Sequence, residues 1–255
     1  MAYSYKGAIS FGLVYIPITL TAAVKENDIG FNMLEKESLS RIQYKKTCVD
    51  CGGKEVSSEN IVKGFQYEKD KYVTFTEEEF EKLKSEKDKN ITISQFVNLA
   101  EIDPVFYDKA YYVSPTAGEK AFVLLLSAME KENKAGIAKT VLGTREALVL
   151  LRVRGGIMLA NTLYFNDEVQ KAPQLPQDKI GKEEFALAKT LIDNMTSVFK
   201  PEQFKDEYNE RLRAAIQDKI DGKEISAPHG EQAANVVNIM DALKKSVEMT
   251  KAKSG

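Results

Sequence analysis

Residues 137–169 constrain the fold of this chain more than any other stretch. Two largely apolar runs, residues 148–154 and 157–163, are joined by Gly155 and Gly156. Short apolar runs that flank a Gly-Gly pair predict a β-hairpin, because glycine readily adopts the positive φ angles of a tight turn. The near-continuous apolar content predicts strands covered on both faces, or a closed barrel whose outside is covered by helices.

The same stretch is basic. Between residues 134 and 154 the cations exceed the anions by four, although the whole chain has a formal net charge of -2. The cations are Lys134, Lys139, Arg145, Arg152 and Arg154, and the anion is Glu146. A local excess of cations on an acidic chain predicts a polyanionic partner. The alternative is that they are solvated side chains at strand edges.

The composition is that of a globular protein. The 255 residues suffice for one large domain or two smaller ones. No run of about 18 apolar residues occurs, so we expect no membrane span. Gly12 and Pro17 divide the apolar N-terminal run, which argues against a secretory signal. Two cysteines without a signal favour a reducing compartment, and a cytoplasmic location is expected.

The hydrophobic pattern predicts many short strands followed by helices. Strands are expected at residues 8–14, 16–23, 29–34, 42–47, 61–67, 71–75, 91–97 and 105–113, with Pro17 at an edge or turn. Thr76 and Glu79 can form a capping box that opens a short helix. A helix is expected at about residues 118–133, and because its segment 121–129 is apolar nearly all round, this helix should be buried.

After a proline-containing linker that begins at Lys171, the pattern is helical. Apolar stripes lie at Phe185, Ala188, Leu191, Ile192, Met195 and Phe199; at Phe204, Tyr208, Leu212, Ala215, Ile216 and Ile220; and, behind a flexible tether, at Val236, Met240, Leu243 and Val247. The last helix is expected to dock on a partner, or to fold back on its own domain.

A second basic stretch contains both cysteines. It carries Arg41, Lys45, Lys46 and Lys54 against Asp50. Cys48 and Cys51, followed by two glycines, are half of a tetrahedral zinc site. The only histidine, His229, is distant in the sequence, so one subunit cannot complete a standard Cys/His site, whereas two subunits could supply four thiolates. Metal-free cysteines are the favoured interpretation, and no thioredoxin-like motif is indicated, because the pair does not open a helix in an α/β pattern.

No common catalytic motif stands out. The phosphate-binding GxxxxGK[ST] loop, the GxGxxG turn, HExxH and GxSxG are all absent from the sequence. Lys219-Ile-Asp-Gly222 matches the KxDG pattern of nucleotidyl transferases, in which the lysine carries the nucleotide. A cation and a glycine are also expected there for structural reasons if Gly222 ends a helix, and we prefer that interpretation.

Several stretches, in order from about Tyr3 to Ile225, together resemble the bacterial Ku family, the DNA end-binding proteins of non-homologous end joining. They include KGAISFGLVYIPITL from Lys6, RIQYKKTC from Arg41, EIDPVFYDKAYYV from Glu101, GIAKTVLGTREALVLLR from Gly136 and FKPEQFKDEYNERLRAAIQDKIDGKEI from Phe199. The resemblance implies an α+β fold: a Ku-type β-barrel core at residues 1–170 with a DNA-encircling bridge at about 35–70, a helical C-terminal arm at 171–225, and a tether with a docking helix at 226–255.

The resemblance also implies a function without catalysis and without a cofactor. Two subunits would form a homodimeric ring on linear double-stranded DNA ends, in the cytoplasm at the nucleoid, and recruit a multifunctional ATP-dependent DNA ligase. The candidate ligase-docking residues are Asp241, Leu243, Lys244 and Lys245. The candidate DNA-binding residues are Arg41, Lys45, Lys46, Lys54, Lys63, Lys139, Arg145 and Arg152. The alternatives are a barrel-type protein-interaction module without end specificity, and a nucleotidyl transferase that acts through Lys219.

Overall fold

The computed structural model describes residues 4–82, 90–142, 145–176, 180–224 and 239–253. The chain divides into two compact units, Met1–Lys171 and Ala172–Gly255. Within the described ranges, no helix combines the length and the apolar character needed to cross a membrane.

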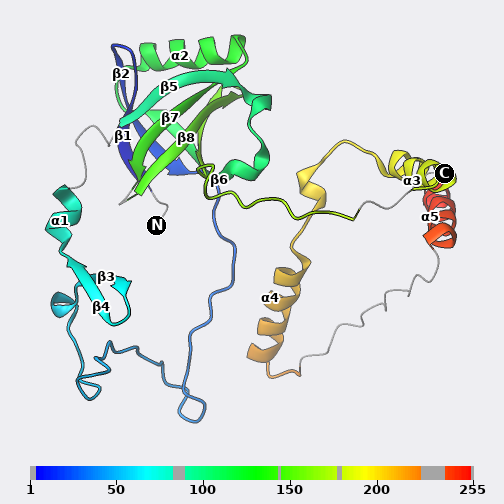
Figure 1. Ribbon diagram of the computed structural model, residues 1–255. Coiled ribbons are helices and arrows are strands. Elements are labelled where there is room, and N and C mark those ends of the chain that lie inside the picture. Colours follow the sequence, from blue (N-terminus) through cyan, green and yellow to red (C-terminus); the bar gives the residue numbers. More distant parts are fainter. Residues whose placement is uncertain (1–3, 83–89, 143–144, 177–179, 225–238, 254–255) are drawn as a thin grey trace. The chain divides into compact units, whose positions relative to one another are not determined.

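Seven strands of the described chain close into a barrel (Figure 1). They are β1 (Ser4–Phe11), β2 (Val14–Ala22), β5 (Asn90–Asn98), β6 (Tyr107–Pro115), β7 (Lys134–Leu142), β8 (Arg145–Arg154) and β9 (Ile157–Leu163). The order around the barrel is β1-β2-β6-β9-β8-β7-β5. Neighbours pair antiparallel except β1 and β5, whose parallel pairing closes the barrel. Closure leaves no strand of the barrel at an open edge.

The predicted β8–β9 hairpin is confirmed. Arg154 pairs with Ile157, so Gly155 and Gly156 form a two-residue turn. Their φ angles are 57° and 72°, and two successive positive φ angles are the geometry of a type I′ turn. The turn therefore sets the register of β8 against β9.

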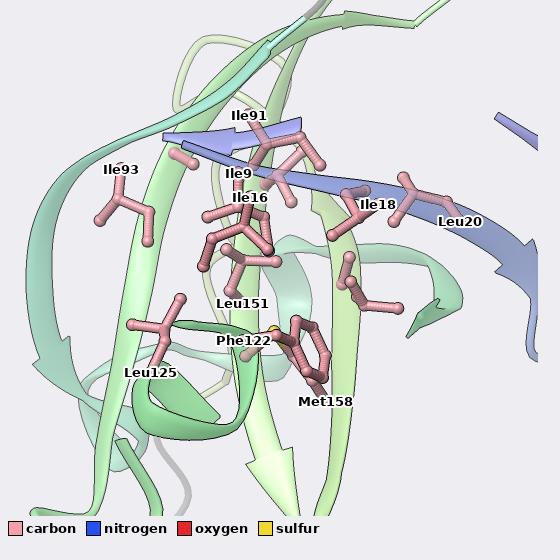
Figure 2. Packing of buried hydrophobic residues seen from close by; sticks show 14 of the residues in the cluster. Ile9, Ile16, Ile18, Leu20, Ile91, Ile93, Phe122, Leu125, Leu151 and Met158 are labelled. Atoms are coloured by element: carbon pink, nitrogen blue, oxygen red, sulfur yellow. The ribbon is translucent and has the colours of Figure 1, made fainter. Parts of the chain in front are cut away.

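The barrel interior is filled by aliphatic side chains that alternate along each strand. Figure 2 shows Ile16, Ile18 and Leu20 of β2 directed into a buried cluster with Leu151 of β8. Leu150, one residue before Leu151, is also fully buried, but it belongs to a second cluster. Adjacent residues of a strand point to opposite faces, so β8 is covered on both sides, as predicted.

The cover of the outer face differs from the prediction of helices. It comes from the connection between β5 and β6, which contains two short 3-10 turns, η3 (Leu99–Glu101) and η4 (Pro104–Phe106). Leu99, Ile102 and Phe106 pack there against the buried cluster that contains Leu150. Asp103 accepts a hydrogen bond from the Val105 amide at 2.9 Å and so opens η4. A short loop with local caps therefore covers the outer face beside Leu150.

Pro17 lies inside β2, so its predicted placement at an edge or turn was wrong. It pairs with Ala8 of β1, and its carbonyl accepts a hydrogen bond from the Thr116 amide at 2.9 Å. The N–H and C=O of a strand residue point to the same side, so the missing N–H also faces β6. The register with β6 begins only at Ile18, and the missing donor removes no ladder bond.

Helix α2 (Glu119–Lys131) lies across one end of the barrel (Figure 1). Phe122, Leu125 and Met129 are buried against the barrel core. Leu124, on the opposite face, is 71% exposed. The prediction of a fully buried helix was wrong, because only one face of α2 meets the barrel.

Residues 23–82 form an excursion that follows β2 and precedes β5 in the chain. This excursion contains η1 (Ser58–Asn60), the paired strands β3 (Lys63–Glu68) and β4 (Lys71–Phe75), and α1 (Glu77–Lys82). The capping box is confirmed: the Thr76 amide donates to the Glu79 carboxylate at 2.7 Å, and the Glu79 amide donates to the Thr76 hydroxyl at 3.2 Å. The strands predicted at 29–34 and 42–47 are wrong, since only isolated bridges occur there.

The second unit is helical in its described part. It contains α3 (Lys182–Met195), η5 (Pro201–Gln203), α4 (Glu207–Ile220) and α5 (Ile239–Lys253). Helices α3 and α5 pack together, with Leu187 and Leu191 half-buried on α3 and Val247 buried on α5. Each helix therefore covers part of the apolar surface of the other.

Candidate nucleic-acid interface

The first cation-bearing element of the excursion is a tight hairpin that ends at Arg41. Leu34 and Arg41 form an isolated bridge, and Arg41 is exposed. The Glu35 carboxylate accepts hydrogen bonds from the amides of Glu37 (3.0 Å) and Ser38 (2.6 Å). These bonds, the one from Glu37 first, lower the pKa of Glu35 to about 2, because they stabilise the charged carboxylate. A buried core is therefore not required to hold this turn.

A second hairpin carries Lys46 and Lys54. The Val56 amide donates to the Lys46 carbonyl at 2.8 Å, and the Cys48 amide donates to the Lys54 carbonyl at 2.9 Å. These bonds involve only the main chain, and both lysine side chains are exposed. The hairpin thus presents its cations to solvent on a hydrogen-bonded frame.

Lys45 and Lys63 already have carboxylate partners. Lys45 Nζ lies 2.8 Å from Glu55 Oε2, and Lys63 Nζ lies 2.8 Å from Glu77 Oε1. Lys63 Nζ also lies 5.0 Å from the centre of the Phe80 ring. All four charged side chains are more than half exposed, and exposed ion pairs contribute about 0–1 kcal/mol. A phosphate can therefore replace these carboxylates at little cost.

Among the candidate cations of the barrel, Arg152 lies far from Arg145. Lys139 of β7 pairs with Glu146 at 3.2 Å, while Arg145 begins β8 and is exposed. Arg152 is seven residues further along β8, which corresponds to about 23 Å of strand. The cationic stretch of the sequence is therefore spread along the barrel and does not form one patch.

Arg152 is held in the barrel wall. It is half-buried, and its Nε donates to Asn161 Oδ1 at 2.9 Å. Asn161 Nδ2 in turn donates to the Lys109 carbonyl at 3.4 Å. This chain of bonds joins β8, β9 and β6, so Arg152 has a structural contact that the exposed lysines lack.

Exposed aromatic side chains on both faces of the β3–β4 ribbon were not predicted from the sequence. Phe65, Tyr67 and Tyr72 are all more than half exposed, and Lys63 and Lys71 lie on the same ribbon. Exposed rings between cations are a common feature of nucleic-acid-binding surfaces. These rings could have been found from the sequence, because apolar and polar residues alternate in both strands and no neighbouring segment was predicted to cover them.

The two cysteines form a close pair in the second hairpin. Their sulfur atoms lie 2.8 Å apart, and neither is in a disulfide. The Cys48 side chain, first through its hydrogen bond and then through its charge, raises the pKa of the Cys51 thiol. Among the residues that the structure describes, no group of three or more His, Cys, Asp or Glu side chains could hold a metal ion. The half zinc site stays a prediction, and His229 lies outside the described residues.

Helix α5 carries the candidate ligase-docking residues. Lys244 and Lys245 are exposed, whereas Leu243 is half-buried. The contact with α3 corresponds to the expected fold-back of this helix on its own domain. The side chain of Asp241 and all of Val236 lie outside what the structure describes.

Lys219 lies in the last turn of α4. The Gly222 amide donates to the Lys219 carbonyl at 3.1 Å, and the Lys223 amide donates to the Asp218 carbonyl at 2.8 Å. Gly222 has a φ angle of 75°. These two bonds and the left-handed glycine make a Schellman motif, which explains the KxDG string as a helix end.

Taken together, the fold and the exposed cations define a closed β-barrel protein in which the segment between two strands carries a basic stretch, residues 41–54. The model of the Ku70/Ku80 beta-barrel domain matches residues 10–189. This chain therefore belongs to the Ku family.

Curated relatives cover nearly the whole chain. It is 48% identical over 247 residues to the non-homologous end joining protein Ku of Lachnoclostridium phytofermentans, with 96% of each chain covered. Over 257 residues it is 43% identical to the protein of the same name from Archaeoglobus fulgidus, covering 98% of this chain and 100% of that one. The Bacillus subtilis protein of that name is 37% identical over 255 residues, with 97% and 82% covered.

Proposed function

We propose that this protein binds double-stranded DNA ends in non-homologous end joining, as a homodimeric ring and without catalysis of its own. The observation that carries the proposal is the basic stretch of residues 41–54: within the segment inserted between two barrel strands, it exposes Arg41, Lys46 and Lys54 on local hairpins. The curated relatives are named for this repair process. A chain with a net charge of -2 can be acidic outside and still present cations to DNA.

The binding should be indifferent to base sequence. Exposed lysine and arginine side chains contact phosphate oxygens, which carry no base identity. Each phosphate that is neutralised adds about 0.9 to the slope of log affinity against log salt, so six contacts give a slope of roughly -5. The exposed ion pairs of Lys45 and Lys63 can exchange their carboxylates for phosphates during binding.

The homodimer is supported by apolar side chains of the second unit that the described residues leave exposed. On α3, Phe185, Ile192 and Met195 are 63%, 66% and 67% exposed. Tyr208 and Ile220 on α4 are also exposed. Exposed apolar side chains of this kind are common at interaction surfaces, and a second copy of the same chain is a common partner.

Recruitment of an ATP-dependent DNA ligase is proposed for α5. The exposed Lys244 and Lys245 offer the partner a cationic face while α3 covers the face of Val247. Leu243, half-buried, lies at the border of the two faces. We place the protein in the cytoplasm, at the nucleoid, because its proposed ligand is there.

The decisive experiment is a competition assay at fixed salt. One labelled linear duplex is bound by the protein, and cold linear, closed-circular and hairpin-capped duplexes of equal mass are added. We expect only duplexes with free ends to compete, because a ring must thread over an end. Equal competition by closed circles would exclude end binding and leave a general polyanion-binding or protein-interaction module.

A further inference from the structure

We propose that Cys48 and Cys51 form a reversible intramolecular disulfide, which makes the second basic hairpin a site of thiol oxidation. The sulfur atoms are free and lie 2.8 Å apart. A disulfide bond is about 2.0 Å long, so the sulfurs must approach by less than about 1 Å. This inference does not depend on whether the neighbouring lysines contact DNA.

The backbone around the pair is held by local hydrogen bonds and a glycine turn. Both main-chain groups of Cys48 are bonded, its amide to the Lys54 carbonyl at 2.9 Å and its carbonyl to the Gly53 amide at 3.1 Å. Gly52 and Gly53 turn the chain with φ angles of 66° and 76°. The approach of the sulfurs can therefore come from side-chain torsions, with the hairpin frame retained.

Access to the pair is open. Cys51 is exposed and Cys48 is half-exposed. A small disulfide such as oxidised glutathione can therefore reach the pair without opening the fold. A cysteine pair of this kind differs from a buried structural cysteine, which is inert because oxidants do not reach it.

The chemistry is thiol–disulfide exchange. One cysteine, as the thiolate, attacks oxidised glutathione, forms a mixed disulfide and releases one glutathione thiolate. The second cysteine loses its proton and attacks the protein sulfur of the mixed disulfide, forming the Cys48–Cys51 bond and releasing the second glutathione. The two protein thiols are oxidised, one glutathione disulfide is reduced to two thiols, and the protons pass to the released glutathione.

The consequence is a stiffer hairpin between Lys46 and Lys54. In the reduced protein, the turn is closed by backbone bonds and by the exposed Lys45–Glu55 pair. A covalent link across the turn removes open conformations. We expect amide hydrogen exchange at Gly53 and Lys54 to slow by about tenfold or more on oxidation.

The test uses the full chain, treated with a chelator and then equilibrated in buffers of increasing oxidised-to-reduced glutathione ratio. Free thiols are trapped by alkylation, and the mass of the protein is measured. The chain has only two cysteines, so any intramolecular disulfide must join them. We expect a species that has lost both thiol hydrogens to become the main form as the ratio rises, and to revert on adding reduced glutathione.

The matched controls are Cys48→Ser and Cys51→Ser, in which the remaining thiol can form only a mixed disulfide or a cross-link between chains. Two outcomes would overturn the proposal. One is wild-type protein that accumulates mixed glutathione disulfides or linked chains in place of the intramolecular bond. The other is wild-type protein that keeps both thiols under every ratio, while each single variant still reacts with glutathione.

Discussion

The barrel and the excursion of residues 23–82 are stabilised by different interactions. In the barrel, side chains such as Leu151 and Ile18 are fully buried, and strands distant in the sequence pair with one another. In the excursion, nearly every residue is exposed, and the turns are closed by bonds across a few residues, as at Glu35. Apolar burial contributes about 25 cal/mol per Å², so stability resides in the barrel.

This difference teaches where mutations can act separately. Cations of the excursion can be removed without opening a core, because their side chains lie in solvent. Arg152 is a barrel residue with a hydrogen-bonded, half-buried side chain, and its removal affects the fold as well as any DNA contact. Four changes of decreasing size test the distinction.

The largest effect is expected from a cavity in the barrel. Leu151→Ala removes a fully buried side chain, and the free energy of unfolding should fall by about 2–5 kcal/mol. Urea denaturation measures the change. The control is Val62→Ala in the excursion, where Val62 is exposed and the change should stay within about 0.5 kcal/mol. If both variants lose the same free energy of unfolding, the stability does not reside mainly in the barrel.

The next effect concerns affinity. Replacing Lys45, Lys46 and Lys54 together with Ala should reduce the slope of log affinity against log salt by about 2.7, at three contacts of 0.9 each. The unfolding free energy should stay nearly unchanged. The control variant replaces the exposed Lys182, Lys189 and Lys205 of the second unit with Ala, which removes the same number of charges. If both triple variants lower the slope equally, only net charge matters and the hairpin is not the contact.

A smaller change in unfolding free energy should distinguish two arginines of β8, Arg152 and Arg154. Arg152→Ala removes the donor to Asn161, and the unfolding free energy should fall by about 1–2 kcal/mol. Arg154→Ala, two residues further along the same strand and exposed, should change it by less than about 0.5 kcal/mol. Thermal or urea unfolding distinguishes them. If Arg152→Ala leaves the unfolding free energy unchanged, the bond to Asn161 does not stabilise the barrel, and Arg152 behaves like a solvated cation.

The smallest effect is the titration of Glu35. Its pKa in the folded protein is about 2, below the ordinary value of 4.5. The hydrogen bonds to the charged carboxylate therefore stabilise the turn fully at pH values above 4.5, and this stabilisation is lost as the pH falls through about 2. In an NMR titration, the Glu35 carboxyl and the Ser38 amide should change together near pH 2. Glu35→Gln should remove that transition. A midpoint near 4.5 would mean that the turn does not hold the carboxylate in solution.

Local features of the fold were predictable. The Gly155–Gly156 turn, the Thr76–Glu79 capping box and the helix end at Gly222 are all present where the sequence indicated them. Each depends on the φ preference of glycine or on hydrogen bonds within a few residues. The error at residues 29–34 and 42–47 has the converse cause: their apolar alternation resembles a strand, but no neighbouring strand pairs with them.

For the candidate site, the sequence predicted which residues are involved, but it did not predict how their side chains are arranged on the surface. The exposed state of Lys46 and Lys54 follows from the charge and turn residues around them. The carboxylate partners of Lys45 and Lys63, and the exposed rings of the β3–β4 ribbon, depend on which elements come near. The separation of Arg145 from Arg152 likewise follows from the extended strand between them.

The sequence by itself determined the β-hairpin of residues 145–163, the helix end at Gly222 and the positions of the basic stretches, because these follow from short-range dihedral preferences, hydrogen bonds and charge. The ends of the neighbouring helices were not determined in this way: the predicted apolar stripes included Phe199 and Phe204, whereas α3 ends at Met195 and α4 begins at Glu207. Only the tertiary structure decided the parallel pairing of β1 with β5 that closes the barrel, the loop that covers Leu150, and the bond that fixes Arg152 to Asn161. These contacts join residues far apart in the chain, and no local preference distinguishes the right partner from the many others that a strand or cation could meet.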